Sequence, residues 1–79
     1  MSLEIKTVRK LRDIKGREAV KAFMKTGGVK RKGKGDHVNI KMPNGQIITI
    51  PESKKIKIGL LKAAIRKAGL TEEEFIELL

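Results

Sequence analysis

Apolar residues recur at helical spacing between residues 16 and 26, on the face opposite the basic residues of that segment. The apolar stripe consists of Ala19, Val20, Phe23 and Met24. This pattern predicts an amphipathic helix. Gly27-Gly28 is predicted to end it, because glycine readily adopts the left-handed conformation that follows many helices. Residues 1–14 lose any regular period and are predicted to form an extended arm, with Leu11 and Ile14 packed against the body.

Alternation of apolar and polar residues replaces the helical period in the middle of the chain. It predicts strands over residues 29–32, over residues 37–42, and over a third stretch that ends at Pro51. Pro43-Asn44-Gly45 is typical of a three-residue hairpin loop, which would pair Ile40 with Ile48. That register places an apolar set on the core face: Val38, Ile40, Met42, Ile48 and Ile50. The opposite face would carry His37, Asn39, Lys41 and Thr49.

Two further helices are predicted after the strands. The first begins near Ile58 and ends at Gly69, and its expected core residues are Ile58, Leu61, Ile65 and Ala68. Thr71 and Glu74 have the spacing of a capping box, which predicts a short last helix through Phe75. The sequence therefore predicts one small α+β domain over residues 1–79. Its predicted order is helix, three strands, helix, helix, with the helices on one face of a three-stranded antiparallel sheet.

Charge narrows the classes of partner. The 79 residues carry a formal net charge of +10, all nineteen Lys and Arg lie in residues 1–67, and residues 68–79 carry four glutamates. Such a balance favours a polyanion such as RNA or DNA. No apolar run approaches the roughly 20 residues of a membrane span. Because cysteine is absent as well, we expect a cytoplasmic protein without disulfides and with no membrane partner.

The candidate chemistry gathers around the single histidine, His37, since histidine alone titrates near neutral pH without a large pKa shift. One histidine and no cysteine make a zinc site implausible, and no cofactor motif is present. Gly35, in the turn before His37, is expected to contact RNA. The basic residues expected to hold phosphates are Lys30, Arg31, Lys32, Lys34, Lys41, Lys62 and Arg66. The last two lie four residues apart on the outer side of the predicted second helix, where an anion between them would relieve their repulsion.

Several segments together resemble HicA-like (YcfA-like) toxin domains. They are residues 11–23 (LRDIKGREAVKAF), Lys34-Gly35-Asp36-His37, residues 48–51 (ITIP), residues 58–61 (IGLL) and residues 65–70 (IRKAGL). The resemblance implies a double-stranded-RNA-binding-domain-like fold, cleavage of messenger RNA without a metal, and an antitoxin partner of the HicB type. The family's catalytic histidine falls on His37, and Gly35 keeps its place in the turn. Asp36 stands where the motif has serine.

Three hypotheses about function follow. The first is an endoribonuclease that uses His37 for proton transfer, with basic residues holding phosphates. Because one histidine does not act as acid and base in a single step, a second group is needed, and Lys34, Asp36 and water are the candidates. The second hypothesis is a non-catalytic RNA- or DNA-binding module of the same fold. The third is a protein whose basic surface serves an acidic protein partner.

Overall fold

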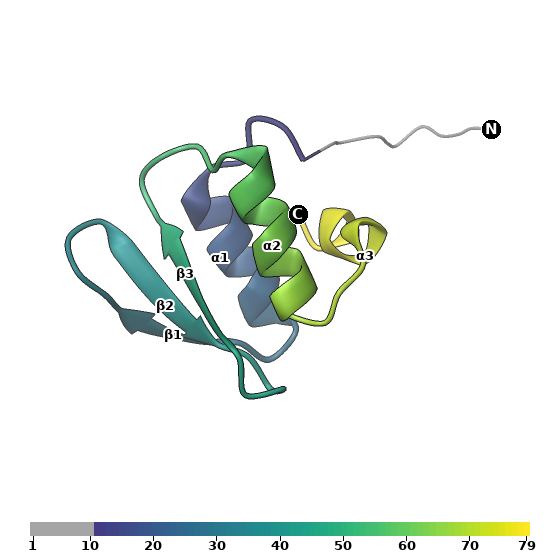
Figure 1. The fold of residues 1–79 in the computed structure, drawn as a ribbon, viewed down its shortest axis with the longest axis horizontal. Helices are drawn as coiled ribbons and strands as arrows, with labels where there is room; N and C mark the ends of the chain where they lie inside the picture. The colour runs from purple at the N-terminus through teal and green to yellow at the C-terminus, as the bar shows by residue number, and fades with distance from the viewer. Residues whose placement is uncertain (1–10) are drawn as a thin grey trace.

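Six elements form the fold in the computed structural model, which describes residues 11–79. In chain order they are α1 (Gly16–Lys25), β1 (Val29–Lys32), β2 (His37–Lys41), β3 (Ile47–Pro51), α2 (Ile58–Lys67) and α3 (Glu72–Glu77). Figure 1 shows the three helices on one side of the sheet, with α1 and α2 next to it and α3 outside α2. This is the predicted α+β order. The predicted arm lies mostly outside the described residues, but Leu11 and Ile14 are buried as expected.

The sheet is antiparallel, with β2 between β1 and β3. The pairing of Ile40 with Ile48 and of Val38 with Ile50 confirms the register predicted from the hairpin loop. Met42 N–H donates to the Gln46 carbonyl oxygen at 2.8 Å, which closes the loop around three residues. Gly45 at its end has a φ of 88°, a conformation that favours glycine.

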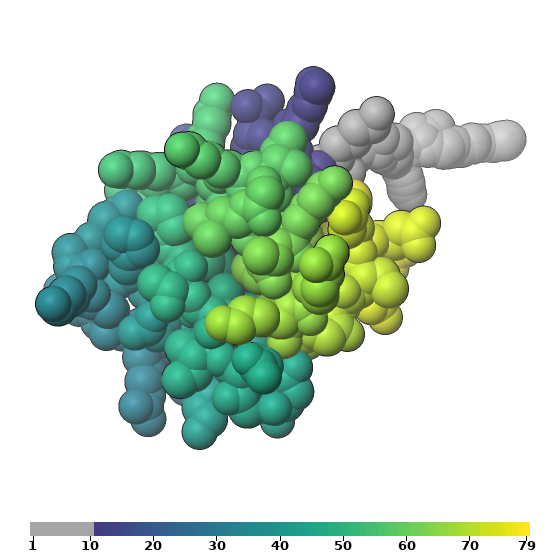
Figure 2. Space-filling view, viewed as in Figure 1, coloured from purple at the N-terminus to yellow at the C-terminus, as the bar shows by residue number. Residues whose placement is uncertain are grey.

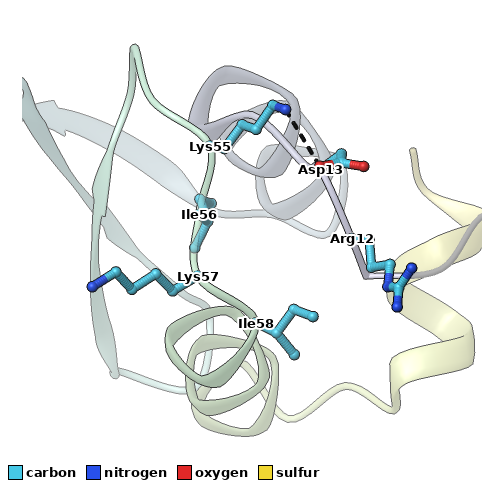
Figure 3. Close-up of a pocket in the computed structure, with 6 residues that line it drawn as sticks. All are labelled: Arg12, Asp13, Lys55, Ile56, Lys57 and Ile58. Atoms are coloured by element: carbon cyan, nitrogen blue, oxygen red, sulfur yellow. Dashed lines mark hydrogen bonds and ion pairs between the residues drawn. The ribbon is translucent and has the colours of Figure 1, made fainter.

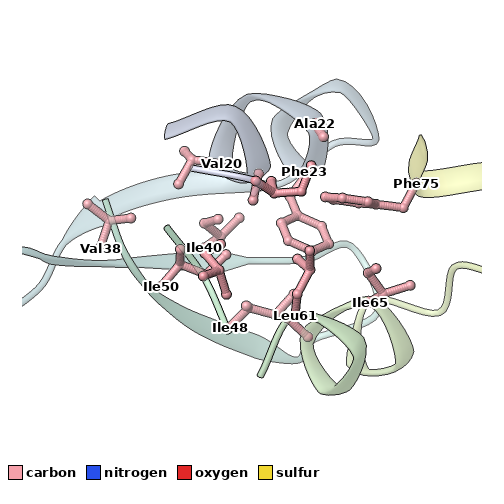
Figure 4. Close-up of a cluster of buried hydrophobic side chains, with 14 of the residues drawn as sticks. Val20, Ala22, Phe23, Val38, Ile40, Ile48, Ile50, Leu61, Ile65 and Phe75 are labelled. Carbon is pink, nitrogen blue, oxygen red and sulfur yellow. The ribbon is translucent and has the colours of Figure 1, made fainter. Parts of the chain in front are cut away.

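One apolar cluster fills the space between sheet and helices (Figure 4). The rings of Phe23 and Phe75 meet at its centre, with centroids 5.0 Å apart and planes tilted by 43°. Both rings are fully buried, so neither offers an exposed platform for stacking bases. Phe75 joins α3 to the core, and the capping box predicted for α3 is present, since Thr71 Oγ1 accepts from Glu74 N–H at 3.0 Å.

The burial predicted for two apolar residues of α1 and α2 is wrong. Met24 and Ile58 are 44% and 43% exposed. The buried alanines Ala22 and Ala64 occupy the corresponding interior positions of α1 and α2. A helix buries only the part of its apolar stripe that its neighbours cover, and Met24 and Ile58 lie outside the covered part of theirs.

The start of α1 packs directly against the end of β3. Gly16 is buried, and a Cβ atom there would collide with the carbonyl group of Pro51. Gly16 N–H donates to the Lys54 carbonyl oxygen at 2.8 Å, and Ile56 N–H donates to the Ile14 carbonyl oxygen at the same distance. The segment after β3 is therefore held along its backbone by the segment that opens α1.

Candidate functional site

His37 begins β2 and is exposed to solvent. The turn that precedes it is closed by two backbone hydrogen bonds, from His37 N–H to the Lys34 carbonyl oxygen and from Gly33 N–H to the His37 carbonyl oxygen, both 2.9 Å. Gly35 has a φ of 54°, in the left-handed region that side chains other than Asn and Asp rarely enter. The glycines of the basic run thus allow a tight turn that presents the histidine at the end of the sheet.

A pocket of about 360 Å³ opens beside this turn. Its walls come from β1, from the turn and the start of β2, and from the residue after β3. The lining residues are Lys30, Lys32, Gly35, Asp36, His37, Val38 and Glu52. The structure therefore brings the histidine, two of the predicted phosphate-binding lysines and Gly35 to one place.

Asp36 faces the segment after β3. Its Oδ1 and Oδ2 atoms both accept from Ser53 N–H, at 3.1 and 3.2 Å, and its carbonyl oxygen accepts from Glu52 N–H at 2.9 Å. Hydrogen bonding by Ser53 lowers the pKa of Asp36, against the opposing effect of desolvation, and the positive charge of Lys54 lowers it further. The carboxylate is thus ionised at neutral pH and engaged with a backbone amide.

Lys30 is paired within the pocket. Its Nζ atom lies 2.8 Å from Oε2 of Glu52, and both side chains are partly exposed. Part of the positive charge predicted for phosphate binding is therefore neutralised by an acid that lines the same pocket. Lys32 is exposed at the end of β1.

The sheet separates the basic residues of β1 by face. Lys30 and Lys32 pair with Ile40 and Val38, whereas Arg31 pairs with Asn39. Because paired residues of an antiparallel sheet point to the same face, the two lysines lie on the helix-covered face of the sheet. Arg31 belongs to the opposite face.

That opposite face carries polar and apolar residues in rows across the strands. One row joins Val29, Lys41 and Ile47, and the valine and isoleucine are 60% and 52% exposed. The next row includes Asn39 and Thr49, whose hydroxyl donates to Asn39 Oδ1 at 2.7 Å. Within residues 11–79, the helices lie on the other side of the sheet (Figure 1), so this face is open.

Lys62 and Arg66 lie on α2 and do not line the pocket. Lys62 Nζ lies 3.8 Å from Oε2 of Glu72, at the start of α3. This contact directs the lysine towards α3 rather than towards the sheet. The structure thus separates these two predicted residues from the histidine.

A second depression, of about 340 Å³, lies between residues 12–13 and the segment leading into α2. Its lining residues are Arg12, Asp13, Lys55, Ile56, Lys57 and Ile58. Lys55 Nζ approaches Asp13 Oδ1 at 3.3 Å, while Lys57 extends away from that pair (Figure 3). The segment after β3 runs from Glu52 at the histidine pocket to this depression, and it carries Lys54, Lys55 and Lys57.

Sequence analysis ended the third strand at Pro51 and did not identify the contribution of Glu52 and Ser53, the two residues that follow it. The signal was the hairpin register itself. Once Val38 pairs with Ile50, His37 must pair with Pro51, and the residues after Pro51 must then pass beside Asp36. Extending the register by two residues would have identified both.

No helix within residues 11–79 is long and apolar enough to span a membrane. In the same part of the chain, no three His, Cys, Asp or Glu side chains gather as a group that could hold a metal ion.

Residues 16–70 match the sequence model of a family described as the HicA toxin of bacterial toxin–antitoxin systems. The matched range extends from the first residue of α1 to just beyond the end of α2, and includes the whole sheet and the pocket. A search among curated proteins found no match.

Proposed function

The chain belongs to the HicA toxin family, and from this premise we propose that it is an endoribonuclease that cleaves messenger RNA, with His37 in proton transfer. The observation that carries the proposal is the position of His37. It is exposed at the start of β2, in a pocket that Lys30 and Lys32 also line. An imidazole beside cationic groups is suited to phosphodiester chemistry, because lysines stabilise the charge that develops on the phosphate.

The proposed reaction needs no group beyond RNA and the protein. The ribose 2′-hydroxyl loses its proton and attacks the adjacent phosphorus, the bond to the 5′-oxygen breaks, and that oxygen takes up a proton. A 2′,3′-cyclic phosphate and a 5′-hydroxyl end result. His37 carries one of the two proton transfers. Lys34, which is exposed in the same turn, and water are the candidates for the other.

The test is cleavage of a long unstructured RNA, with a chelator present, by wild type, His37→Ala and His37→Gln. Both variants are expected to lose about 10²–10⁴-fold in rate, the usual contribution of general acid–base catalysis. Both should keep the wild-type melting temperature, since an exposed side chain contributes little packing. Lys21→Ala, an exposed change on α1, is the control and should cleave normally. Cleavage by His37→Ala at the wild-type rate would exclude His37 as the proton carrier. Binding without cleavage by the wild type would favour the non-catalytic RNA- or DNA-binding module.

Membership of a toxin–antitoxin family implies an antitoxin partner. We propose that it is an inhibitory protein of the HicB type that covers the open face of the sheet and buries His37. Arg31 and Lys41 on that face would attract an acidic partner and speed association, and the exposed Val29 and Ile47 provide apolar anchors. The register of the three strands places all four of these residues on the open face.

Co-expression with the neighbouring gene product and measurement of complex affinity test this docking. Ile47→Asp is expected to weaken the complex by more than tenfold, the usual effect of losing an interface anchor. Met24→Asp is the matched control, because Met24 is similarly exposed but lies on α1. Equal weakening by the two variants, or continued RNA cleavage in the complex, would contradict occlusion by this face.

A further inference from the structure

The segment after β3 is held beside His37 from two sides. On one side, the Asp36 carboxylate accepts from Ser53 N–H through both oxygens, and the Asp36 carbonyl oxygen accepts from Glu52 N–H. These contacts join the residue immediately before the histidine to the segment after β3. Figure 1 shows the β1–β2 turn and the β3–α2 connection at the same end of the sheet.

On the other side, the start of α1 fixes the same segment. Gly16 N–H donates to the Lys54 carbonyl oxygen at 2.8 Å, and Lys15 forms an antiparallel bridge with Lys55. Gly16 also lies against the Pro51 carbonyl group, with no room for a side chain. The backbone of this segment is therefore held by the start of α1 at Lys54 and Lys55, and by Asp36 at Glu52 and Ser53.

We propose that Asp36 is a positioning residue, which ties the β3–α2 segment to the His37 turn so that Lys54 contacts the RNA phosphate beside His37. This inference rests on the proposed function and adds two residues to it. Lys54 directly follows Ser53, the residue whose amide Asp36 binds, and it is exposed. A lysine has a positive charge on a long flexible stem, the features with which this residue type binds a phosphate.

Asp36 is poorly suited to the alternative role of general acid or base. Both of its oxygens already accept from Ser53 N–H. The same contacts lower the pKa of Asp36, which makes the carboxylate a weaker base and leaves it without a proton to donate at neutral pH. Its negative charge beside the pocket also disfavours a phosphate. The positioning contact explains why an acid is tolerated there.

The experiment compares Asp36→Asn with Asp36→Ala. Both remove the negative charge, so any difference between them reports the contact with Ser53 and not electrostatics. The asparagine side chain retains an oxygen that accepts from Ser53 N–H, and the alanine does not. Hydrogen exchange of the Ser53 amide, measured by NMR without RNA, is expected to be roughly threefold to tenfold faster in Asp36→Ala than in Asp36→Asn.

RNA binding gives the second readout. Asp36→Ala is expected to bind a single-stranded oligonucleotide about threefold to tenfold more weakly than Asp36→Asn, because the side-chain contact that holds Ser53, and with it the start of the Lys54 segment, against the His37 turn is lost. In a Lys54→Ala background, Asp36→Ala and Asp36→Asn should bind RNA equally. The Asp36–Ser53 contact then has no lysine to position. Lys21→Ala, which removes a lysine from α1, is the control background and should preserve the difference.

Cleavage gives the third readout and separates this inference from the proposed function. With an active wild type, Asp36→Asn is expected to keep its kcat, and Asp36→Ala to show a raised KM. Loss of kcat in Asp36→Asn as complete as in His37→Ala would overturn the positioning role, because Asp36 would then act in the chemistry.

If the wild type binds RNA without cleaving it, the proposed nuclease function fails while the amide exchange and the binding comparison still decide the inference. Equal Ser53 exchange in the two Asp36 variants would overturn it, as would equal RNA binding by them in the background that retains Lys54.

Discussion

Lys30 and Glu52 form an ion pair across the pocket, with 2.8 Å between Nζ and Oε2. The lysine comes from β1 and the glutamate follows β3, so the pair spans the sheet order from one edge strand to the other. An anion that enters the pocket must compete with Glu52 for Lys30. The pair therefore sets how much of the local positive charge is available to RNA.

Glu52→Gln is expected to strengthen RNA binding by roughly twofold to fivefold, the range of a partly exposed ion pair. Lys30 would become available to a phosphate, so the log–log dependence of affinity on salt should steepen by about 0.7. Titration of a fluorescent oligonucleotide at several salt concentrations measures both effects. Glu73→Gln, an exposed acid on α3, is the control and should change neither. Weaker binding by Glu52→Gln would mean that the glutamate positions Lys30 for RNA.

Removal of Lys32 and Lys34 together should flatten the salt dependence of RNA binding. Each phosphate contact on a single strand contributes about 0.7 to the log–log slope, so the expected change is up to about 1.4. Lys62→Ala combined with Arg66→Ala removes the same charge from α2, away from the pocket, and the slope should then change less. An equal change in the two double variants would show that RNA does not distinguish the pocket from α2.

Gly16→Ala is expected to destabilise the fold strongly, by about 2–4 kcal/mol, because the new Cβ would collide with the Pro51 carbonyl group and separate α1 from β3. Gly59→Ala is the matched control. Gly59 lies in the first turn of α2 with open space around it, and alanine there should stabilise the helix by up to about 1 kcal/mol. Urea denaturation of both variants measures the two free energies of unfolding. A neutral Gly16→Ala would contradict the close approach of α1 to β3.

Gly35→Ala tests the backbone of the histidine turn. The position has open space around it, so the only cost is the left-handed φ of 54°, about 1 kcal/mol. Gly35→Asn should cost less, because asparagine tolerates this conformation better than alanine. Thermal unfolding of the two variants gives the comparison. Equal losses would show that the turn is constrained by something other than φ.

The pH dependence of stability should contain the contribution of Asp36. Its folded-state pKa lies below its ordinary value of 3.8, so the stabilisation is present above the unfolded pKa and is lost as the pH falls through the folded one. The difference in unfolding free energy between wild type and Asp36→Ala should therefore be constant from about pH 7 to pH 5 and shrink below about pH 4. A difference that stays constant through the acid range would show that the Asp36–Ser53 contact does not depend on the ionised carboxylate.

The sequence by itself determined the features that depend on near neighbours. Gly27 ends α1 and Gly69 ends α2, both with positive φ, because helix termination depends on the residue at that position. The hairpin register follows from the three-residue loop and from the apolar alternation on either side, since a slip by one residue would turn Ile40 away from the core. The exposed position of His37 at the start of β2 was predicted from the same alternation.

Only the tertiary structure decided how distant segments meet. The periodicity of α1 and α2 did not show which edge of each apolar stripe would be covered, so Met24 and Ile58 are exposed where burial was expected. The roles predicted for the basic residues remain predictions, but the structure shows that these residues lie in different parts of the fold. Lys30 faces Glu52, and Lys62 faces Glu72. Such pairings depend on the docking of elements far apart in sequence, which hydrophobic periodicity does not specify.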